Sequence, residues 1–357
     1  MVLSFSLEGD IVENVVIIGG GIAGLSCLNA LLDQGVSPLL LEAATIGTPK
    51  MCGEFIAPQT VDLLQNWGID SIQPIQKIIF SAKNKKFNLT LQKSAGAIAR
   101  NAVEHLLAER AREKGGRIRE NSSIQKIIPA TISNPIYTFY LPTGEEIHAK
   151  TAIFATGRIG QTTSIPPIYV GIKTHIKHIL EPATLMMYSV KDAYFGIVPI
   201  SQDTSNCACL VKREAVENSG SCHEFLYHLI KEHAHLSDLK FNELTWLEAR
   251  TPEFGKKIIP EWPNAYWIGD AIASLHPAIG SGFAHGMTSA MMAVDYYLQN
   301  NPSEYRKICL QGIHSKLQIG KWLHQLLLQP TLSFCMLPLL QFNPWISVLL
   351  QKKLGYN

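Results

Sequence analysis

The sequence predicts an α/β fold in which a domain with a parallel sheet is interleaved with a mostly antiparallel one. Residues 15–42 carry an apolar strand, a glycine-rich turn, a helix and a second apolar strand, which is the order of a βαβ unit. Residues 75–91 alternate loosely around a polar centre, as a hairpin does, and 166–246 contains further β-like runs. Parallel-strand signals return at 151–155 and 266–268, so the first domain is interrupted twice.

Each element of the opening unit has its own local signal. Val15–Ile18 is a short apolar run that fits a buried parallel strand. A helical pattern runs from Ile22 to about Gln34, and Gly35 follows it in the manner of a C-terminal cap. Pro38–Glu42 is the second strand. Further helices are expected over Asn101–Gly115 and Phe283–Leu298, and further strands over Thr151–Ala155, Tyr194–Pro199, Cys207–Val211 and Tyr266–Ile268.

Composition narrows the class of protein. At 357 residues with 46% hydrophobic and 17% charged residues, the chain can form two packed domains with a large core. A net charge of +2 without long runs of like charge argues against a nucleic-acid partner. The seven cysteines are irregularly spaced with no CxxC pair, so we expect neither a disulfide framework nor a metal site. The first ten residues lack the features of a secretory signal, and we expect a cytoplasmic protein.

The domains are expected to divide the chain unevenly. The nucleotide-binding domain should comprise 1–74, 97–165 and 255–300, and the substrate domain 75–96 and 166–254, followed by a helical cap over 301–357. The end of this tail is strongly apolar, but prolines cut it into pieces too short to span a bilayer. It is expected to cover the core, or alternatively to form a hydrophobic lid or a peripheral membrane contact for a lipophilic substrate.

The glycine-rich turn carries the first chemical signal. Gly19-Gly20-Gly21-Ile22-Ala23-Gly24 follows a strand and opens a helix, the setting in which backbone N–H groups and a helix N-terminus hold a pyrophosphate. Glu42, followed by Ala43, ends the second strand, where a carboxylate would accept hydrogen bonds from a ribose diol. The acid argues against a 2′-phosphate, so FAD or NAD is indicated rather than NADP.

A second glycine-containing segment lies near the end of the predicted nucleotide-binding domain. An apolar strand runs into Gly269 and Asp270, then into Pro277, and then through Gly280 and Gly282 into a helix that begins at Phe283. The chain here resembles the FAD-binding family that includes p-hydroxybenzoate-hydroxylase-like monooxygenases and geranylgeranyl reductases. The resemblance implies that the acid binds the ribityl and pyrophosphate region of FAD. It also implies that the glycine turn places backbone N–H groups near the flavin N1 and C2 carbonyl, where reduced flavin is anionic.

Other positions extend the resemblance over about residues 13–300. Arg100 stands where the family places an arginine against the FAD phosphates, although Glu104 occurs near the helix start in place of the usual aspartate. The family's hydroxylases carry an Asp-Gly pair where this chain has Thr156-Gly157, which puts direct NADPH docking in doubt. The residues expected to hold FAD are Gly19, Gly21, Ile22, Ala23, Gly24, Glu42, Ala43, Arg100, Gly157, Gly269, Asp270, Pro277, Gly280, Gly282 and Phe283.

Cys52, Glu54 and His276 are the candidate catalytic residues. Cys52-Gly53-Glu54 resembles the Cys-Gly loop of the reductase branch, which should lie near flavin and substrate. The thiol could donate a proton or be structural, and Glu54 could act as acid–base if burial raises its pKa. His276 or His285 could face the isoalloxazine ring, or either could be structural. The same two interpretations apply to Lys173 and His175.

The function expected from these features is that of an FAD-dependent oxidoreductase acting on a lipophilic, aromatic or polyketide-like small molecule. It would act as a monooxygenase through a flavin C4a-hydroperoxide, or as a reductase that moves hydride, with NADH or NADPH as the transient electron donor. A non-catalytic prenyl- or lipid-binding protein on the same scaffold is the alternative.

Overall fold

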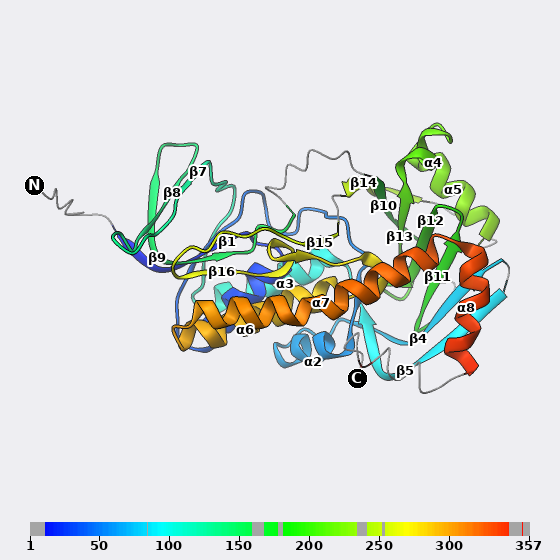
Figure 1. Ribbon diagram of the computed structural model, residues 1–357, viewed down its shortest axis with the longest axis horizontal. Helices are drawn as coiled ribbons and strands as arrows, with labels where there is room; N and C mark the ends of the chain where they lie inside the picture. The colour runs from blue at the N-terminus through cyan, green and yellow to red at the C-terminus, as the bar shows by residue number, and fades with distance from the viewer. Residues whose placement is uncertain are drawn as a thin grey trace, which may run out of the picture.

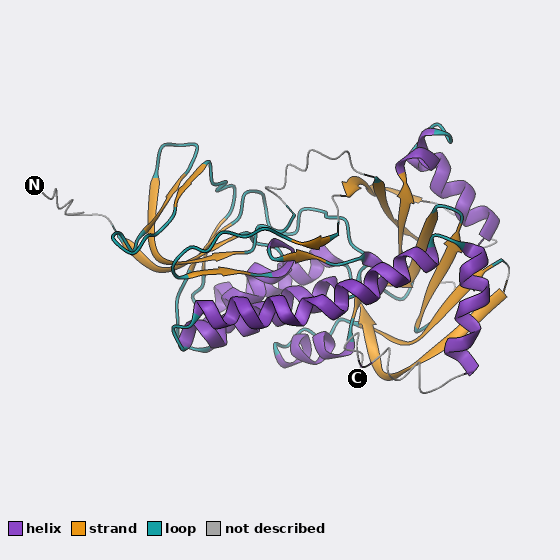
Figure 2. Ribbon diagram, viewed as in Figure 1, coloured by secondary structure: helices purple, strands orange, loops and turns teal. Residues whose placement is uncertain are grey.

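The computed structural model describes residues 11–83, 85–158, 168–177, 181–233, 241–251, 254–342 and 352 (Figure 1). The described residues form a mixed α/β fold with two main sheets at opposite ends of an elongated molecule, joined by long helices (Figure 2). The predicted fold class is confirmed. The exact domain boundaries stay a prediction.

The first sheet is centred on the opening strand of the chain. Its strands lie in the order β6-β2-β1-β9-β8-β7, and β16 pairs with the end of β9. The strands are β1 (Val12–Ile18), β2 (Leu39–Leu41), β6 (Arg117–Arg119), β7 (Lys126–Ile128), β8 (Tyr137–Tyr140), β9 (Glu146–Phe154) and β16 (Ala265–Trp267). β1, β2, β6, β9 and β16 run parallel, as expected for a βαβ unit, whereas β7 and β8 add an antiparallel meander that we did not predict.

Three helices pack together beside this sheet. α1 (Ile22–Asp33) packs on both α3 (Arg100–Glu113) and α6 (Gly282–Leu298), which is why it is buried on nearly every face. Gly35 has a φ of +74°, and Val36 N donates to Leu31 O at 2.9 Å, so the helix ends in the glycine cap that the sequence predicted.

The second sheet has the order β14-β10-β13-β12-β11-β4-β5-β3 and is antiparallel except where β4 pairs with β11. Its strands are β3 (Phe55–Ile56), β4 (Gln73–Ala82), β5 (Lys85–Ala97), β10 (Tyr169–Ile176), β11 (Thr184–Val190), β12 (Ala193–Pro199), β13 (Ser205–Lys212) and β14 (Phe241–Thr251). Alternate residues face two different cores: Met187 and Tyr194 join the core shared with the first sheet, whereas Tyr188 and Phe195 pack under α4 (Arg213–Glu217) and α5 (Cys222–His233).

The C-terminal helices connect the two sheets. α7 (Pro302–Leu327) runs beside α6 and onward to the second sheet, where α8 (Pro330–Phe342) lies across β4, β5 and β11 (Figure 1). The predicted helical cap is therefore present as far as Phe342, and most of the apolar tail beyond it lies outside the described residues. Within the part of the chain that is described, no helix is long and apolar enough to cross a membrane.

Short elements complete the described chain. They are α2 (Pro58–Asn66), the strand pair β15 (Gly255–Lys256) and β17 (Ala273–Ser274), and the 3-10 turns η1 (Gly269–Ala271) and η2 (Pro277–Ile279).

Candidate active site

The first glycine turn brings β1, α1 and β9 into close contact. Gly19 has a φ of +109°, and a Cβ on it would overlap Ala155 O at the end of β9. A Cβ on Gly24 would overlap Gly19 O. These two glycines are therefore required by backbone packing, as expected for a dinucleotide-binding turn.

Gly21 faces a charged group instead of packed backbone. A Cβ built on it would lie 3.5 Å from Arg100 Nη2 and 3.9 Å from Lys50 Nζ. Arg100 Nε donates to Glu104 Oε1 at 2.9 Å, and Lys50 Nζ donates to Glu104 Oε2 at 3.3 Å. Glu104 is fully buried and holds both cations beside the turn, so this cradle fits the negative charge of a pyrophosphate.

Sequence reasoning missed the role of Lys50. Lys50 lies two residues before Cys52, and a basic residue shortly after the ribose-binding strand is a signal for phosphate contact. Glu104, noted as a departure from the family pattern, is the residue that orients both cations.

Glu42 lies at the end of β2 with both carboxylate oxygens engaged. Gly20 N donates to Oε2 at 2.5 Å and Ala44 N donates to Oε1 at 3.0 Å. A carboxylate oxygen accepts more than one hydrogen bond, so these contacts fix the side chain without preventing it from binding a ribose. The role of Glu42 and Ala43 in FAD binding stays a prediction.

The second glycine segment packs directly on the first. Gly269 has a φ of +58°, and its N–H donates to Ser289 Oγ at 2.8 Å. A Cβ on Gly269 would lie 2.9 Å from the Ala23 side chain, so Ala23 joins the two motifs that sequence analysis linked only by resemblance. Ile22 and Phe283 are both buried in the core around this junction.

Asp270 faces two basic residues that we did not predict. Arg158 Nε lies 3.8 Å from Asp270 Oδ2, and Lys257 Nζ donates to Gly157 O at 2.7 Å. Burial lowers the pKa of Lys257, although the Asp270 carboxylate opposes that shift. Gly157, with a φ of +64°, thus lies beside Lys257 at the end of β9.

The turn that precedes α6 is open on one side. Pro277 begins η2, Gly280 adopts a φ of +58°, and Gly282 is the first residue of α6. A Cβ on Gly282 would meet nothing within 4 Å. We call residues 276–282 the flavin turn.

Glu54 is the centre of a buried ionic cluster at the junction of the two sheets. Lys173 Nζ donates to its Oε1 at 2.5 Å, and His175 Nε2 lies 2.8 Å from its Oε2. Arg100 N also donates to Oε1, at 2.9 Å. Glu54 is only 1% exposed and has a φ of +56°, a strained conformation that these three contacts hold in place. We call Glu54, Lys173 and His175 the Glu54 cluster.

The Glu54 cluster decides the condition under which Glu54 could act as an acid–base group, namely that burial raises its pKa. Burial acts to raise the pKa of Glu54, but the hydrogen bond from His175 and the charge of Lys173 outweigh it and hold the pKa below its ordinary value. The condition that burial raises the pKa of Glu54 is therefore not met, because β10 of the second sheet supplies two donors. The residue stays ionised at neutral pH and orients Lys173 and His175.

Cys52 lies next to the Glu54 cluster. Its Sγ accepts a hydrogen bond from Glu54 N at 3.3 Å, and its carbonyl accepts one from Asn206 Nδ2 of β13 at 3.3 Å. Burial raises the pKa of the thiol, against the opposing charge of Arg100, so Cys52 carries its proton at neutral pH.

His276 and His285 lie in different surroundings. The centroid of the His276 ring lies 4.7 Å from that of the Phe254 ring and 4.9 Å from that of the His324 ring on α7. None of the described contacts joins His276 to Cys52 or Glu54. Burial lowers the pKa of His276 to about 4. His285 lies 3.1 Å from Gly269 O, and burial lowers its pKa as well, so both histidines are neutral at pH 7.

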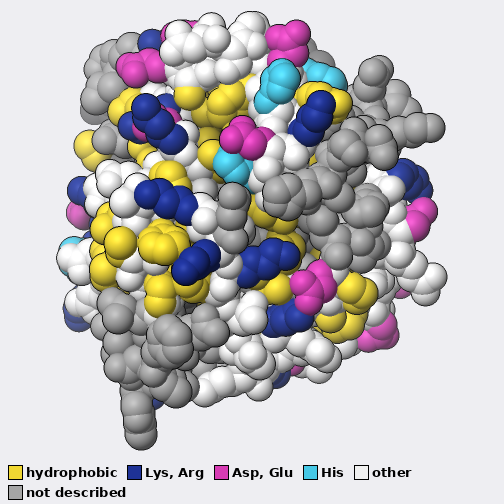
Figure 3. All heavy atoms as spheres, turned by 90° about the vertical axis from the view of Figure 1, so that its right-hand side faces the viewer, with side chains coloured by type: hydrophobic (Ala, Val, Ile, Leu, Met, Phe, Trp, Pro, Cys, Tyr) yellow, Lys and Arg dark blue, Asp and Glu magenta, His cyan; other side chains and the backbone are white. Residues whose placement is uncertain are grey.

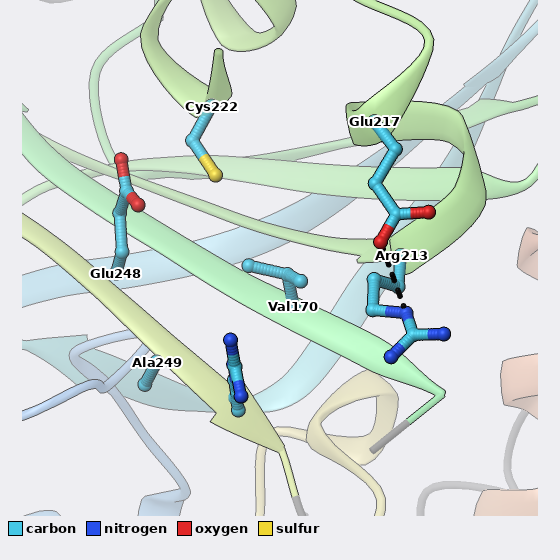
Figure 4. A pocket seen from close by; sticks show the side chains of 7 residues that line it. Val170, Arg213, Glu217, Cys222, Glu248 and Ala249 are labelled. Atoms are coloured by element: carbon cyan, nitrogen blue, oxygen red, sulfur yellow. Dashed lines mark ion pairs between the residues drawn. The ribbon is translucent and has the colours of Figure 1, made fainter. Parts of the chain in front are cut away.

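A separate cavity of about 350 Å³ lies on the face of the second sheet that is turned away from the flavin turn (Figure 4). It opens beside α4 and α5, where Arg213 pairs with Glu217 at 3.3 Å and Cys222 lies near Glu248. Figure 3 shows that hydrophobic side chains and charges of both signs are mixed over this end of the molecule. The cavity is therefore remote from the flavin turn and has no dominant charge.

Comparison with known proteins identifies the family. The sequence matches the FAD binding domain model over residues 13–295. No curated protein sequence matches the chain.

Solved structures share the fold. A geranylgeranyl bacteriochlorophyll reductase-like protein from Thermoplasma acidophilum is 18% identical, with a TM-score of 0.74 over 91% of this chain and 90% of that one. The flavin-dependent brominase Bmp2 is 14% identical, with a TM-score of 0.80 over 97% and 94% of the two chains. PqsL, a probable FAD-dependent monooxygenase from Pseudomonas aeruginosa, is 13% identical, with a TM-score of 0.74 over 90% and 98%. The chain therefore belongs to the FAD binding domain family and is an FAD-dependent oxidoreductase.

Proposed function

We propose that this enzyme reduces a carbon–carbon double bond of an apolar small molecule, with NADH or NADPH as the electron donor. The observation that carries the proposal is the protonated Cys52 thiol next to the Glu54 cluster. The thiol lies at the junction of the first sheet, which we call the cofactor sheet, and the second sheet, which we call the substrate sheet. Bound FAD supplies hydride transfer in such a reaction.

The residues around Cys52 fit the proton requirement of this reaction. Hydride addition to one carbon of a double bond leaves negative charge on the other carbon, which a proton must neutralise. Cys52 holds such a proton, and the cationic Lys173 and Arg100 nearby would stabilise the thiolate left behind. Glu54 fixes Lys173 in this position through its buried carboxylate.

The apolar side chains on the side of the second sheet that faces the first sheet fit an apolar substrate. On that side of the second sheet, Leu185, Met187 and Leu210 belong to the core that also includes residues of the flavin turn and of α8. α8 contributes Leu337 to the same core and covers β4, β5 and β11. These contacts support a lid role for the apolar tail more directly than the peripheral membrane contact that the sequence also allowed.

Oxygenation is the second candidate, and the family itself supports it. The fold is shared with PqsL, whose name describes a monooxygenase, and oxygen insertion also needs a dry, apolar pocket. Nothing in the described contacts favours the non-catalytic lipid-binding alternative.

The test separates the two reactions by the mass of the product. The yellow protein is reduced with NADH or NADPH under nitrogen and given geranylgeraniol as the probe. A second sample receives the probe in air containing ¹⁸O₂. We expect the product to gain two hydrogens per reduced double bond without oxygen present. A product that forms only in air and carries ¹⁸O would replace the proposal with monooxygenation.

Variants of cysteine test the proton donor. Cys52→Ala should retain FAD and its reduction by the nicotinamide but lose most alkene reduction, whereas exposed Cys335→Ala on α8 should behave as the native enzyme. Full turnover by Cys52→Ala would make Cys52 a structural residue.

A further inference from the structure

Helix α7 is fastened to both sheets. Near its start, Tyr305 Oη donates to Trp267 O of β16 at 2.7 Å. At its end, Ser189 Oγ of β11 donates to Leu327 O at 2.7 Å, and Asp192 N donates to Leu328 O at 3.1 Å. Its 26 residues span about 39 Å at 1.5 Å per residue, so one rigid element connects the cofactor sheet to the substrate sheet.

Between these anchors, α7 packs directly on the flavin turn. A Cβ on Gly320 would lie 3.1 Å from His276 Cβ and 3.2 Å from its Cδ2, closer than side chains normally approach. Glycine inside a helix is unfavourable by about 1 kcal/mol relative to alanine, so a close approach is a physical reason for Gly320. Gly312 in the same helix is exposed, and a Cβ there would meet nothing within 4 Å.

His324, one turn after Gly320, continues the contact toward the substrate sheet. Its ring lies 4.9 Å from the His276 ring, and its Nδ1 lies 3.3 Å from Tyr194 Oη on β12. His324 is 3% exposed, and Tyr194 lies on the sheet face that shares a core with the flavin turn. The side chains of Tyr194, His324 and His276 thus form a continuous chain of contacts that ends at the flavin turn.

Two of the ring nitrogens in this row of contacting side chains are buried without a hydrogen-bond partner within the described residues. They are His276 Nδ1 and His324 Nε2. Buried polar groups normally have partners, and the energy lost here must be balanced by the packing around them. Small displacements of α7 would therefore displace His276, which immediately precedes Pro277.

We propose that Gly320 and His324 are positioning residues for the flavin turn, and that Tyr194 couples the position of this turn to the substrate sheet. Through them α7 sets the distance between the backbone N–H groups of the turn and the flavin. Because those groups stabilise the negative charge of reduced FAD, α7 tunes the midpoint potential of the cofactor. This role does not depend on which reaction the enzyme catalyses.

The test compares two glycines of one helix. Gly320→Ala and Gly312→Ala both add a methyl group to α7, but only the first would contact His276. We expect Gly312→Ala to leave the flavin absorption spectrum and midpoint potential unchanged. Gly320→Ala should displace the turn and lower the preference for reduced over oxidised FAD by about tenfold, which is a negative shift of about 30 mV for a two-electron couple. Equal potentials and spectra in Gly320→Ala and the native protein would overturn the proposal.

A second pair of variants is decisive if Gly320→Ala does not fold or does not retain FAD. Tyr194→Phe removes the hydroxyl that contacts both His324 and the backbone N–H of Ala278 in the flavin turn. Tyr188→Phe changes a buried tyrosine on the opposite face of the sheet. We expect Tyr194→Phe to shift the potential in the same direction as Gly320→Ala, and Tyr188→Phe to leave it unchanged. Adding Tyr194→Phe to His324→Ala should shift the potential less than Tyr194→Phe does alone, because only the contact of the hydroxyl with Ala278 is then left to lose. Additive shifts in the double variant, or no shift in Tyr194→Phe, would refute coupling through His324.

Discussion

Glu54→Gln tests whether the Glu54 cluster is an ionic unit. The substitution keeps the size of the side chain but removes its charge, which leaves the buried Lys173 without its carboxylate partner. It also turns one acceptor into an amide donor that must face Lys173, His175 or Arg100 N, all of which are donors to Glu54. Removing one partner from a buried ion pair is unfavourable by about 3–5 kcal/mol, and Glu54 is 1% exposed, so we expect a loss of this size.

The assay is urea-induced unfolding of the FAD-loaded protein followed by circular dichroism, with FAD saturating in every sample. The matched control is Glu145→Gln, which breaks an exposed pair with Arg119 and should leave the free energy of unfolding unchanged within error. Adding Lys173→Met to Glu54→Gln should recover part of the loss, because the unpaired buried cation is then gone. A loss below about 1 kcal/mol for Glu54→Gln, the level of a surface pair, would refute the reasoning.

The pH dependence provides an independent check with a definite sign. The pKa of Glu54 lies below its ordinary value of 4.5 in the folded protein, so its stabilising contribution is present above about pH 4.5 and is lost as the pH falls through the folded-state pKa. The stability difference between the native protein and Glu54→Gln should therefore be constant near neutral pH and shrink in acid. A difference that grows as the pH falls would contradict the assigned direction of the shift.

Three further predictions concern the cofactor cradle. Glu42→Ala should weaken FAD binding by about 1–3 kcal/mol in fluorescence titration, because ribose and backbone groups lose their acceptor. Lys50→Met should weaken binding by a similar amount, about 1.5–3 kcal/mol for a hydrogen bond to a charged group, and should flatten its salt dependence. Gly24→Ala should prevent FAD retention or folding because its methyl group would overlap Gly19 O, whereas Gly312→Ala on α7 should fold and bind FAD normally.

The parts of the fold that sequence reasoning predicted are those with local signals. Gly35 caps α1, the glycine turn joins β1 to α1, and the strand before Gly269 pairs parallel with β9, all within a few residues of expectation. The β7–β8 meander was missed because its strands are short, with Lys126–Ile128 only partly buried and weakly patterned. β8 pairs with β9 and β7 pairs with β8, so these short strands are specified by their neighbours in the sheet.

In the candidate site as well, sequence reasoning found the residues that have a local signal and gave little weight to those that the fold brings together. Sequence reasoning found Cys52, Glu54 and Arg100 because each stands at a motif, but it gave Lys173 and His175 little weight. These residues lie more than a hundred positions from Glu54 and meet it only because β10 is placed across the loop. No local pattern reports such a meeting, and the condition placed on the pKa of Glu54 considered its burial without these partners.

The position of the Glu54 cluster explains why two interleaved domains are needed for one site. Arg100 contacts both Glu54, through its backbone N–H, and Glu104, through its side chain, so the phosphate cradle and the Glu54 cluster share one residue at the start of α3. Lys173 approaches the same point from the substrate sheet. A shift of β10 on substrate binding would therefore act on Glu54 and, through the first turn of α3, on the residues predicted to hold FAD. The chain returns to the first sheet after each part of the second, which fixes both ends of this contact to the first sheet.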